Sequence, residues 1–273
     1  MIVKKTILLS FLFLSQLVLA QNDSITPLKE VVIADVSLGK NNKSQTLQVL
    51  NDSIIQKNQS SLSELLNYNS VLYFKDYGRG MLSTVSFRGT TASQTAVVWN
   101  GININSQLNG STDFNTITAT NFNTIIVKPG GGSVNYGSGA LGGTVHLNND
   151  LIYNAPLEVQ IRMDYGSFNT RGINGKINVG TKKWTSQFGF SQNSSNNDYD
   201  YINKYTWKGE QRKNLNGLYV TTNLNANLGY KINAKNSIKL YSQTSATDRH
   251  ISLVTESESK TKYINSFNRN LLE

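Results

Sequence analysis

The sequence has no cysteine at all, and proline, histidine and charged residues are scarce. Among its 273 residues are three prolines and two histidines, and 16% are charged, against about a quarter in soluble domains. Without cysteine the chain can hold no disulfide, no cysteine-ligated zinc and no cysteine nucleophile. His146 and His250 have no metal-ligand spacing around them. Neither a phosphate-binding Gly-Lys-Ser/Thr nor a serine nucleophile elbow occurs, so we expect no enzyme and no required cofactor.

The one long apolar run stands at the start of the chain. Lys4 and Lys5 precede an apolar stretch over Ile7–Leu14, and Ala20 offers a small-residue cleavage point. This pattern predicts a cleavable secretory signal peptide over residues 1–20, with a buried N-terminal helix as the alternative. No later run is long enough for a transmembrane helix. We therefore expect an exported chain that either is soluble or crosses a membrane with β-strands.

Basic residues outnumber acidic ones, 26 to 17, which gives a net charge of +9. The lysines are dispersed along the chain rather than gathered in one stretch. Dispersed charge on an exported protein argues against a nucleic-acid partner.

Residues 45–150 mix turn signals with short strands and a helix, which predicts an α+β unit. Ser61 and Glu64 have the spacing of a capping box and open a short helix over residues 62–66. Asn100-Gly101 is the strongest short signal for a β-hairpin. Strands are expected at Leu47–Leu50, Val71–Phe74, Thr84–Phe87, Thr95–Trp99, Ile102–Ile104, Thr124–Lys128 and Gly142–Leu147.

Residues 151–273 alternate apolar and polar side chains. The full runs have about ten residues, the length of a tilted transmembrane β-strand. The pattern predicts about six antiparallel transmembrane strands, too few to close a barrel. The runs are Leu157–Tyr165, Ile173–Val179, Trp184–Phe190, Leu218–Tyr230, one from Ile238 and one from Tyr263.

The connections between these runs alternate in length. Those at 181–183 and 233–236 are short, whereas 193–216 and 248–261 are long and polar; the short stretch Gly166–Thr170 is the exception. Outer-membrane barrels have short turns on the periplasmic side and long loops outside. A soluble antiparallel sandwich also alternates in polarity and is the alternative.

Four motifs follow one another over residues 61–148. They are SLSELLNYNSVLYF, VSFRG, AVVWNGININSQLNGSTDFNTI and IIVKPGGGSVNYGSGALGGTVHLN. This series resembles the plug domain of TonB-dependent outer-membrane receptors, most closely the vitamin B12 (cobalamin) transporter branch.

The resemblance implies a barrel of about 22 strands whose lumen is filled by the plug. It divides the chain into a signal peptide (1–20), a flexible segment (21–44), a plug domain (45–150) and the N-terminal part of the barrel (151–273). On this basis we expect the chain to be part of a longer receptor.

The resemblance also implies a site for TonB, the protein that transmits energy from the inner membrane. The matching segment is Glu30, Val31, Val32, Ile33 and Ala34. Such a segment binds its partner by strand addition, through backbone hydrogen bonds. A first strand of the plug is the alternative.

The substrate-binding residues are implied in the same way. The stretch after the hairpin matches the plug loop that meets cobalamin in the resembling transporters, and its amides and hydroxyls suit an amide-fringed ligand; an ordinary polar turn is the alternative. The residues are Asn105, Ser106, Gln107, Leu108, Asn109 and Ser111, with Asp76 and Tyr77 in a second loop.

Two basic residues are candidates for anchoring the plug. Arg88, in VSFRG, matches an arginine that pairs with barrel-wall carboxylates in the family, and an exposed arginine of little energetic weight is the alternative. Lys128 stands where the family commonly has a second arginine. Glycines expected to permit tight turns and close packing are Gly89, Gly101, Gly137, Gly139, Gly142 and Gly143.

Asp198, Asp200 and Asp248 fall in the expected outer connections. Clustered oxygen ligands suit Ca²⁺, and solvated loop acids are the alternative. Taken together, the sequence predicts TonB-dependent transport of cobalamin or another corrinoid across the outer membrane of a Gram-negative bacterium, with TonB, the chelate and outer-membrane lipid as partners. A siderophore–iron receptor and a secreted β-rich binding protein or adhesin are the alternatives.

Overall fold

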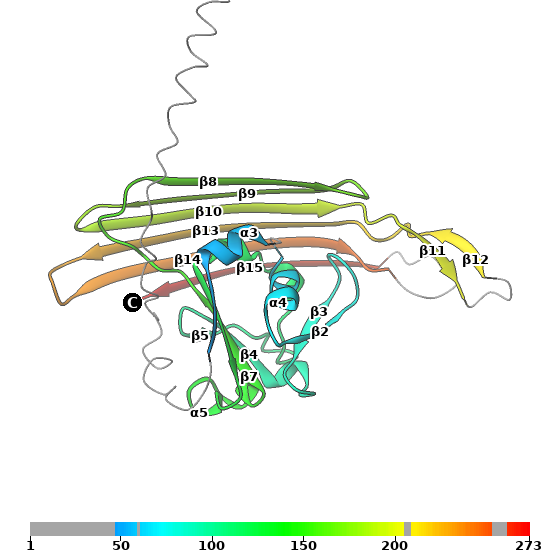
Figure 1. The fold of residues 1–273 in the computed structure, drawn as a ribbon, viewed down its shortest axis with the longest axis horizontal. Coiled ribbons are helices and arrows are strands. Elements are labelled where there is room, and N and C mark those ends of the chain that lie inside the picture. Colours follow the sequence, from blue (N-terminus) through cyan, green and yellow to red (C-terminus); the bar gives the residue numbers. More distant parts are fainter. Residues whose placement is uncertain (1–46, 59–60, 205–208, 253–260) are drawn as a thin grey trace, which may run out of the picture. The chain divides into compact units, whose positions relative to one another are not determined.

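The computed structural model describes residues 47–58, 61–204, 209–252 and 261–273, all within one compact unit over residues 33–273. The predicted signal peptide and the segment Glu30–Ala34 lie outside the described residues. None of the described helices is long and apolar enough to span a membrane. Two sheets dominate the described part, a short mixed one and a long antiparallel one (Figure 1).

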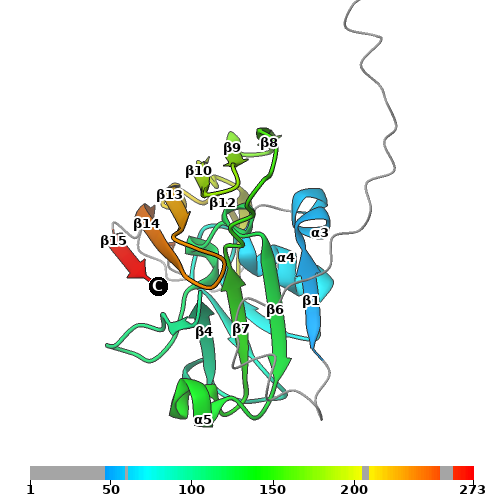
Figure 2. The ribbon, with the colours of Figure 1, turned by 90° about the vertical axis from the view of Figure 1, so that its left-hand side faces the viewer.

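The first part of the chain is an α+β domain, as predicted. Its sheet has the order β1-β6-β7-β4-β5, antiparallel except for the parallel pair β4–β7, and four of these strands stand side by side in Figure 2. The strands are β1 (Gln48–Asn51), β4 (Thr95–Trp99), β5 (Ile102–Asn103), β6 (Thr124–Pro129) and β7 (Gly143–Asn148), with a separate hairpin of β2 (Tyr73–Asp76) and β3 (Ser83–Ser86). The helices are α3 (Asp52–Lys57), α4 (Leu62–Asn69) and α5 (Ser133–Tyr136), with 3-10 turns η2 (Ala92–Gln94), η3 (Phe114–Thr116), η4 (Ala119–Asn121) and η5 (Ser138–Ala140).

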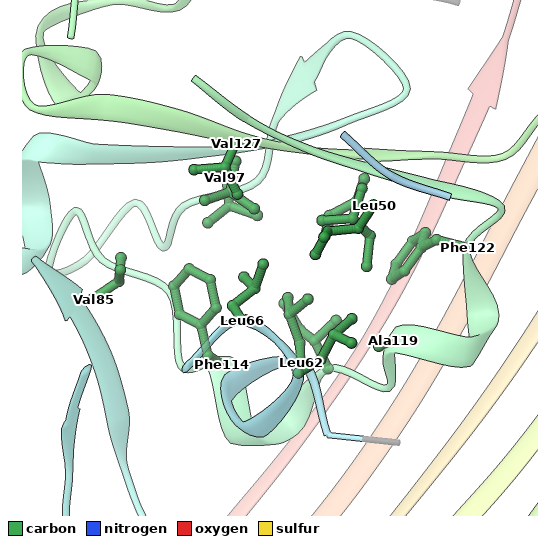
Figure 3. Close-up of a cluster of buried hydrophobic side chains, with 14 of the residues drawn as sticks. Leu50, Leu62, Leu66, Val85, Val97, Phe114, Ala119, Phe122 and Val127 are labelled. Atoms are coloured by element: carbon green, nitrogen blue, oxygen red, sulfur yellow. The ribbon is translucent and has the colours of Figure 1, made fainter. Parts of the chain in front are cut away.

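Helix α4 and the sheet enclose one apolar core. Leu62, Leu65 and Leu66 are fully buried, because spacings of three and four residues place them on one face of the helix. They belong to the same cluster as side chains of the sheet and of the turns before β6 (Figure 3). Burial of each such side chain contributes about 1.5–3 kcal/mol. The other labelled members are Leu50, Val85, Val97, Phe114, Ala119, Phe122 and Val127.

The start of α4 corrects one prediction. Ser61 is the N-cap, but its side chain makes no capping bond. Glu64 does not turn back to it, because the guanidinium of Arg79 lies 2.9 Å from its carboxylate. A capping box does occur at Thr91 and Gln94, before β4. Helix α3 was not predicted, although Asn51 caps it by accepting from the Ile54 N–H at 3.1 Å.

The predicted hairpin is confirmed. Asn100 and Gly101 both have positive φ, 43° and 89°, as the tightest hairpin turn requires, and Trp99 pairs with Ile102. Among the predicted glycines, Gly143 permits close packing: a Cβ there would lie 2.7 Å from the Lys128 carbonyl oxygen and 2.8 Å from the Phe87 ring.

The second sheet has the order β15-β14-β13-β10-β9-β8 and is antiparallel throughout. It confirms the six predicted strands, and the sheet is open rather than closed. Between β10 and β13 the predicted long connection contains a further hairpin, β11–β12. The strands are β8 (Glu158–Gly166), β9 (Thr170–Gly180), β10 (Trp184–Ser195), β11 (Asp200–Asn203), β12 (Glu210–Lys213), β13 (Tyr219–Lys231), β14 (Ser237–His250) and β15 (Lys262–Leu272).

The polarity of this sheet is the reverse of that in a soluble protein. On the face turned to the plug, Ser191, Asn223 and Asn227 are at most 1% exposed, while on the outer face Ile161 and Met163 are 69% and 74% exposed. A soluble sandwich would bury the apolar set, because that burial drives its folding. The sheet therefore carries the lipid-facing pattern of a membrane barrel.

Candidate ligand cavity and plug contacts

A cavity of about 990 Å³ lies between the plug and the loop-side half of the long sheet. The plug side contributes the turn after β2, the loop after β5 and η3. The sheet side contributes β14, β15 and the β11 segment. Its lining includes Tyr77, Ile104, Ser106, Asn109, Ser111, Asp113, Tyr199, Tyr201, Arg249, Tyr263, Phe267 and Arg269. A volume of this order is at the upper end for small-molecule sites.

The structure brings half of the predicted substrate residues into this cavity. Tyr77, Ser106, Asn109 and Ser111 line it, although they come from two separate plug loops. The remaining residues are elsewhere: Gln107 and Leu108 project from the loop tip, where Leu108 is 96% exposed, and Asp76 and Asn105 have other partners.

Asn105 is a structural residue of the plug, and this corrects its predicted role. Its Oδ1 accepts from the Val97 N–H at 2.8 Å and the Thr112 hydroxyl at 3.1 Å. Its Nδ2 donates to the carbonyl oxygens of Thr95 and Gly110, both at 2.8 Å. Two donors and two acceptor sites are thus all occupied. The amide holds the 106–112 loop against β4 and has nothing left for a ligand.

We expect Asn105→Ala to lower the free energy of unfolding by about 1–3 kcal/mol, because it leaves backbone groups of β4 and of the loop unpaired. Urea titration monitored by tryptophan fluorescence measures this. Gln107→Ala, in the same loop but exposed, is the matched control and should change stability by less than about 0.5 kcal/mol. Equal stability of the two variants would contradict the structural role.

Asp76 also shapes its loop. It accepts from the Gly78 N–H at 2.9 Å and from the Asn115 amide at 3.3 Å. Burial raises the pKa of the Asp76 carboxyl, against the opposing effect of these hydrogen bonds. The neighbouring Tyr77, whose N–H donates to Leu82 at 3.0 Å, is the residue of this loop that reaches the cavity.

The aromatic wall of the cavity was not predicted. Tyr263 and Phe267 are on β15, and Tyr199 and Tyr201 flank or belong to β11. The guanidinium of Arg269 lies 3.7 Å from the centroid of the Phe267 ring. The alternation of β15 places Tyr263 and Phe267 on the same face of the strand, together with the other odd-numbered positions. The sequence does not say that this is the face turned to the plug.

A buried ion pair joins the sheet to the plug beside the cavity. Arg249 of β14 lies 2.6 Å from Asp113, and the two side chains are only 6% and 15% exposed. Arg249 also donates to the Gly80 carbonyl oxygen at 3.3 Å and lies over the Tyr263 ring. Asp113 accepts in turn from the N–H groups of Ser83 and Asn115 at 3.1 and 3.2 Å.

A second pair lies nearer the other end of the sheet. Lys176 of β9, with 5% of its side chain exposed, is 3.0 Å from Asp52 of α3. Arg162 of β8 donates to the carbonyl oxygens of Gln56 and Asn58 at the end of the same helix. In both pairs the cation comes from the sheet and the acid from the plug.

The predicted anchors Arg88 and Lys128 make no such contact among the described residues, and their anchoring role stays a prediction. Arg88 is exposed, with φ of 47°, and forms no ion pair with the described residues. Lys128 is 2% exposed within β6 and likewise has no acidic partner in the described part of the chain. Of the groups the structure describes, Asp113 and Asp52, not plug cations, carry the charged contacts to the sheet.

Between these pairs the contact is made by uncharged polar groups. The Thr118 hydroxyl oxygen accepts from Ser191 and Asn223, both at 3.0 Å. Asn149 donates to the Asn121 carbonyl oxygen at 2.8 Å and to Gln187 at 3.3 Å. Amide and hydroxyl side chains hold the plug here, while Tyr241 of β14 joins the apolar core of the plug.

The three candidate calcium ligands do not converge. Asp198 lies 2.8 Å from Lys213, and this hydrogen bond lowers the pKa of the carboxyl. Asp200 begins β11, and Asp248 lies on the outer face of β14 rather than in a loop. Within the described ranges, no group of three or more acidic or histidine side chains could hold a metal ion.

Comparison with known proteins places the plug in a family. Residues 40–144 match the family model of the TonB-dependent receptor plug domain. The vitamin B12 transporter BtuB of Vibrio cholerae is 30% identical over 124 residues, which are 44% of this chain and 20% of the relative. BtuB of Vibrio vulnificus is 36% identical over 70 residues, 26% of this chain and 11% of the relative. The match thus spans about a fifth of the Vibrio cholerae protein.

Solved structures share this fold over most of the chain. The FrpB iron transporter of Neisseria meningitidis superimposes with a TM-score of 0.63 at 14% identity, covering 83% of this chain and 36% of that one. The copper transporter OprC gives 0.60 at 16% identity, covering 76% and 31%. At such identities the likeness establishes the fold. Residues 40–144 therefore match a TonB-dependent receptor plug domain, and the strands after them form an open antiparallel sheet with the fold of those transporters.

Proposed function

We propose that this chain is part of an outer-membrane transporter that takes up a large nutrient chelate, most specifically cobalamin or another corrinoid. The observation that carries the proposal is the cavity of about 990 Å³ in which plug hydroxyls and amides face aromatic side chains of the sheet. Ser106, Asn109 and Ser111 can donate and accept hydrogen bonds without imposing charge. The similarity to vitamin B12 transporters supports the choice of ligand.

A ferric siderophore is the second candidate. Phe267 and Arg269 form a flat, cationic surface in the cavity, which suits an anionic aromatic chelate. Structural neighbours include the siderophore receptor PiuA of Acinetobacter baumannii, with a TM-score of 0.57 at 13% identity.

In the proposed mechanism, the signal peptide directs export and residues 30–34 engage TonB by strand addition. Substrate binds first, on the outer side, between the plug loops and β14–β15. TonB then pulls on the N-terminal segment and remodels the plug. The polar interface around Thr118 supports this step, since hydrogen bonds between amides and hydroxyls can be exchanged for bonds to water at small net cost.

Binding of cyanocobalamin to outer-membrane vesicles carrying the chain tests the ligand, with and without added Ca²⁺. We expect saturable binding, weakened about tenfold by Phe267→Ala or Asn109→Ala, since removal of a central contact costs more than 1 kcal/mol. Tyr165→Ala is the matched control, because Tyr165 is an aromatic residue 82% exposed on the outer face. Absence of cyanocobalamin binding in both conditions rejects the corrinoid, and binding of a ferric catecholate instead would establish the second candidate.

A further inference from the structure

Four lysines gather at the short-turn end of the long sheet. Lys182 and Lys183 form the β9–β10 turn, Lys231 ends β13, and Lys235 lies in the β13–β14 turn. The two hairpins are neighbours, since the Lys231 N–H donates to the Lys183 carbonyl oxygen at 2.8 Å, and both turns lie at the same end of the sheet in Figure 1. All four side chains are exposed, and none forms an ion pair with an acid among the described residues.

The described acids at this end form no ion pair with the four lysines. Glu273 lies 3.1 Å from Lys239, Asp150 accepts from Thr124 at 2.8 Å, and Glu158 accepts from Gln160 at 2.9 Å. Against these three acids stand the four lysines and Lys239, so the surface keeps a net positive charge.

The cations at the opposite end are only partly paired. Lys213 lies 2.8 Å from Asp198, and Arg212 lies 2.8 Å from Glu210. Arg171, Lys204 and Lys262 at that end form no ion pair with the described residues, so what distinguishes the short-turn end is that four unpaired cations lie on two adjacent hairpins. No described acid pairs with these four lysines, so their countercharge is free to come from outside the chain.

An aromatic pair fixes the level of these lysines relative to a bilayer. Trp184 directly follows Lys183, is 59% exposed on the outer face, and lies 4.3 Å from Tyr230 between ring centroids. Tryptophan and tyrosine concentrate where the hydrocarbon meets the headgroups. Further along the outer face the side chains become apolar, beginning with Phe188 and Leu228. The lysines therefore lie at headgroup level, in the turns that adjoin Trp184 and Tyr230 on the side away from the apolar band.

We propose that Lys182, Lys183, Lys231 and Lys235 form a binding surface for the phosphate groups of anionic phospholipids, such as phosphatidylglycerol, in the leaflet at the short-turn end. Lysine at an anionic membrane surface is attracted to it, and its ammonium group binds phosphate as a point charge. The surface orients the barrel sheet and resists its displacement when the plug is pulled. This inference rests on the proposed membrane placement of the sheet.

Fluorescence quenching of Trp184 by brominated lipid tests the surface. The chain is folded into vesicles of phosphatidylcholine and phosphatidylglycerol at a fixed ratio, in which only one lipid is brominated. Subtraction of the signal of Trp184→Phe isolates the emission of Trp184 from that of the other tryptophans. After correction for lipid abundance, we expect brominated phosphatidylglycerol to quench at least about twofold more than brominated phosphatidylcholine.

The triple variant Lys182→Gln, Lys183→Gln, Lys235→Gln should lose this preference. The matched control removes three lysines from the opposite end, Lys204→Gln, Lys213→Gln and Lys262→Gln, and should retain it. Equal quenching by the two lipids in the unsubstituted chain overturns the lipid surface while leaving the membrane placement intact. No quenching by either lipid overturns the membrane placement itself, and the lipid surface with it.

Discussion

Replacing Asp113 by asparagine is expected to lower the free energy of unfolding by about 3–5 kcal/mol, because it strands the buried guanidinium of Arg249 without its counterion. The pair is 2.6 Å apart with side chains 15% and 6% exposed, so solvent screens it weakly. Asparagine keeps an oxygen for the N–H groups of Ser83 and Asn115. The substitution therefore removes the charge, while the turn before η3 keeps its hydrogen bonds. Urea unfolding of the chain in lipid vesicles measures the change.

Two further variants show whether the loss of stability comes from the unpaired charge or from any change at this position. Asp113→Asn combined with Arg249→Gln should recover most of the lost stability, because no unpaired charge remains. Glu64→Gln breaks the Glu64–Arg79 pair, whose side chains are 27% and 42% exposed, and should cost no more than about 1 kcal/mol. If the double variant is no more stable than Asp113→Asn alone, the pair is not what holds this part of the plug to the sheet.

Replacing Leu224 by arginine is expected to lower the free energy of unfolding by a similarly large amount. Leu224 lies in the middle of β13, opposite Phe190 and Thr244, and is 52% exposed on the outer face. Facing lipid, the arginine should cost about 2–4 kcal/mol. On a soluble protein, the same exposed position would tolerate it within about 0.5 kcal/mol. The equilibrium between urea-unfolded chain and chain folded into vesicles measures the difference.

A control lies on the neighbouring strand. Gln192 is on the outer face of β10 and exposed, two positions nearer the loops than Phe190. Gln192→Arg should cost at most about 1 kcal/mol, because the penalty falls toward the membrane boundary. Nearly equal, small costs for the two arginines would point to the soluble sandwich instead of the barrel.

The sequence determined the architecture because its signals are local. Alternating polarity predicts a strand with two unlike faces wherever it occurs, and Asn100-Gly101 can make its tight turn with little help from the rest of the chain. The plug motifs likewise follow one another without interruption. These features led from the residues alone to the α+β plug, the six strands of the open sheet and the family of the plug domain.

Which residues meet depends on how the plug packs against the sheet. Asn105 looked like a ligand contact and is instead bonded fully within the plug, since β4 lies close enough to use both ends of its amide. Among the described residues, the charged contacts between plug and sheet join Asp113 to Arg249 and Asp52 to Lys176. Such pairs join residues far apart in the chain, so no local pattern marks them. Packing of the plug against the sheet sets their distances and burial, and thereby determines which polar side chains are left to face the cavity.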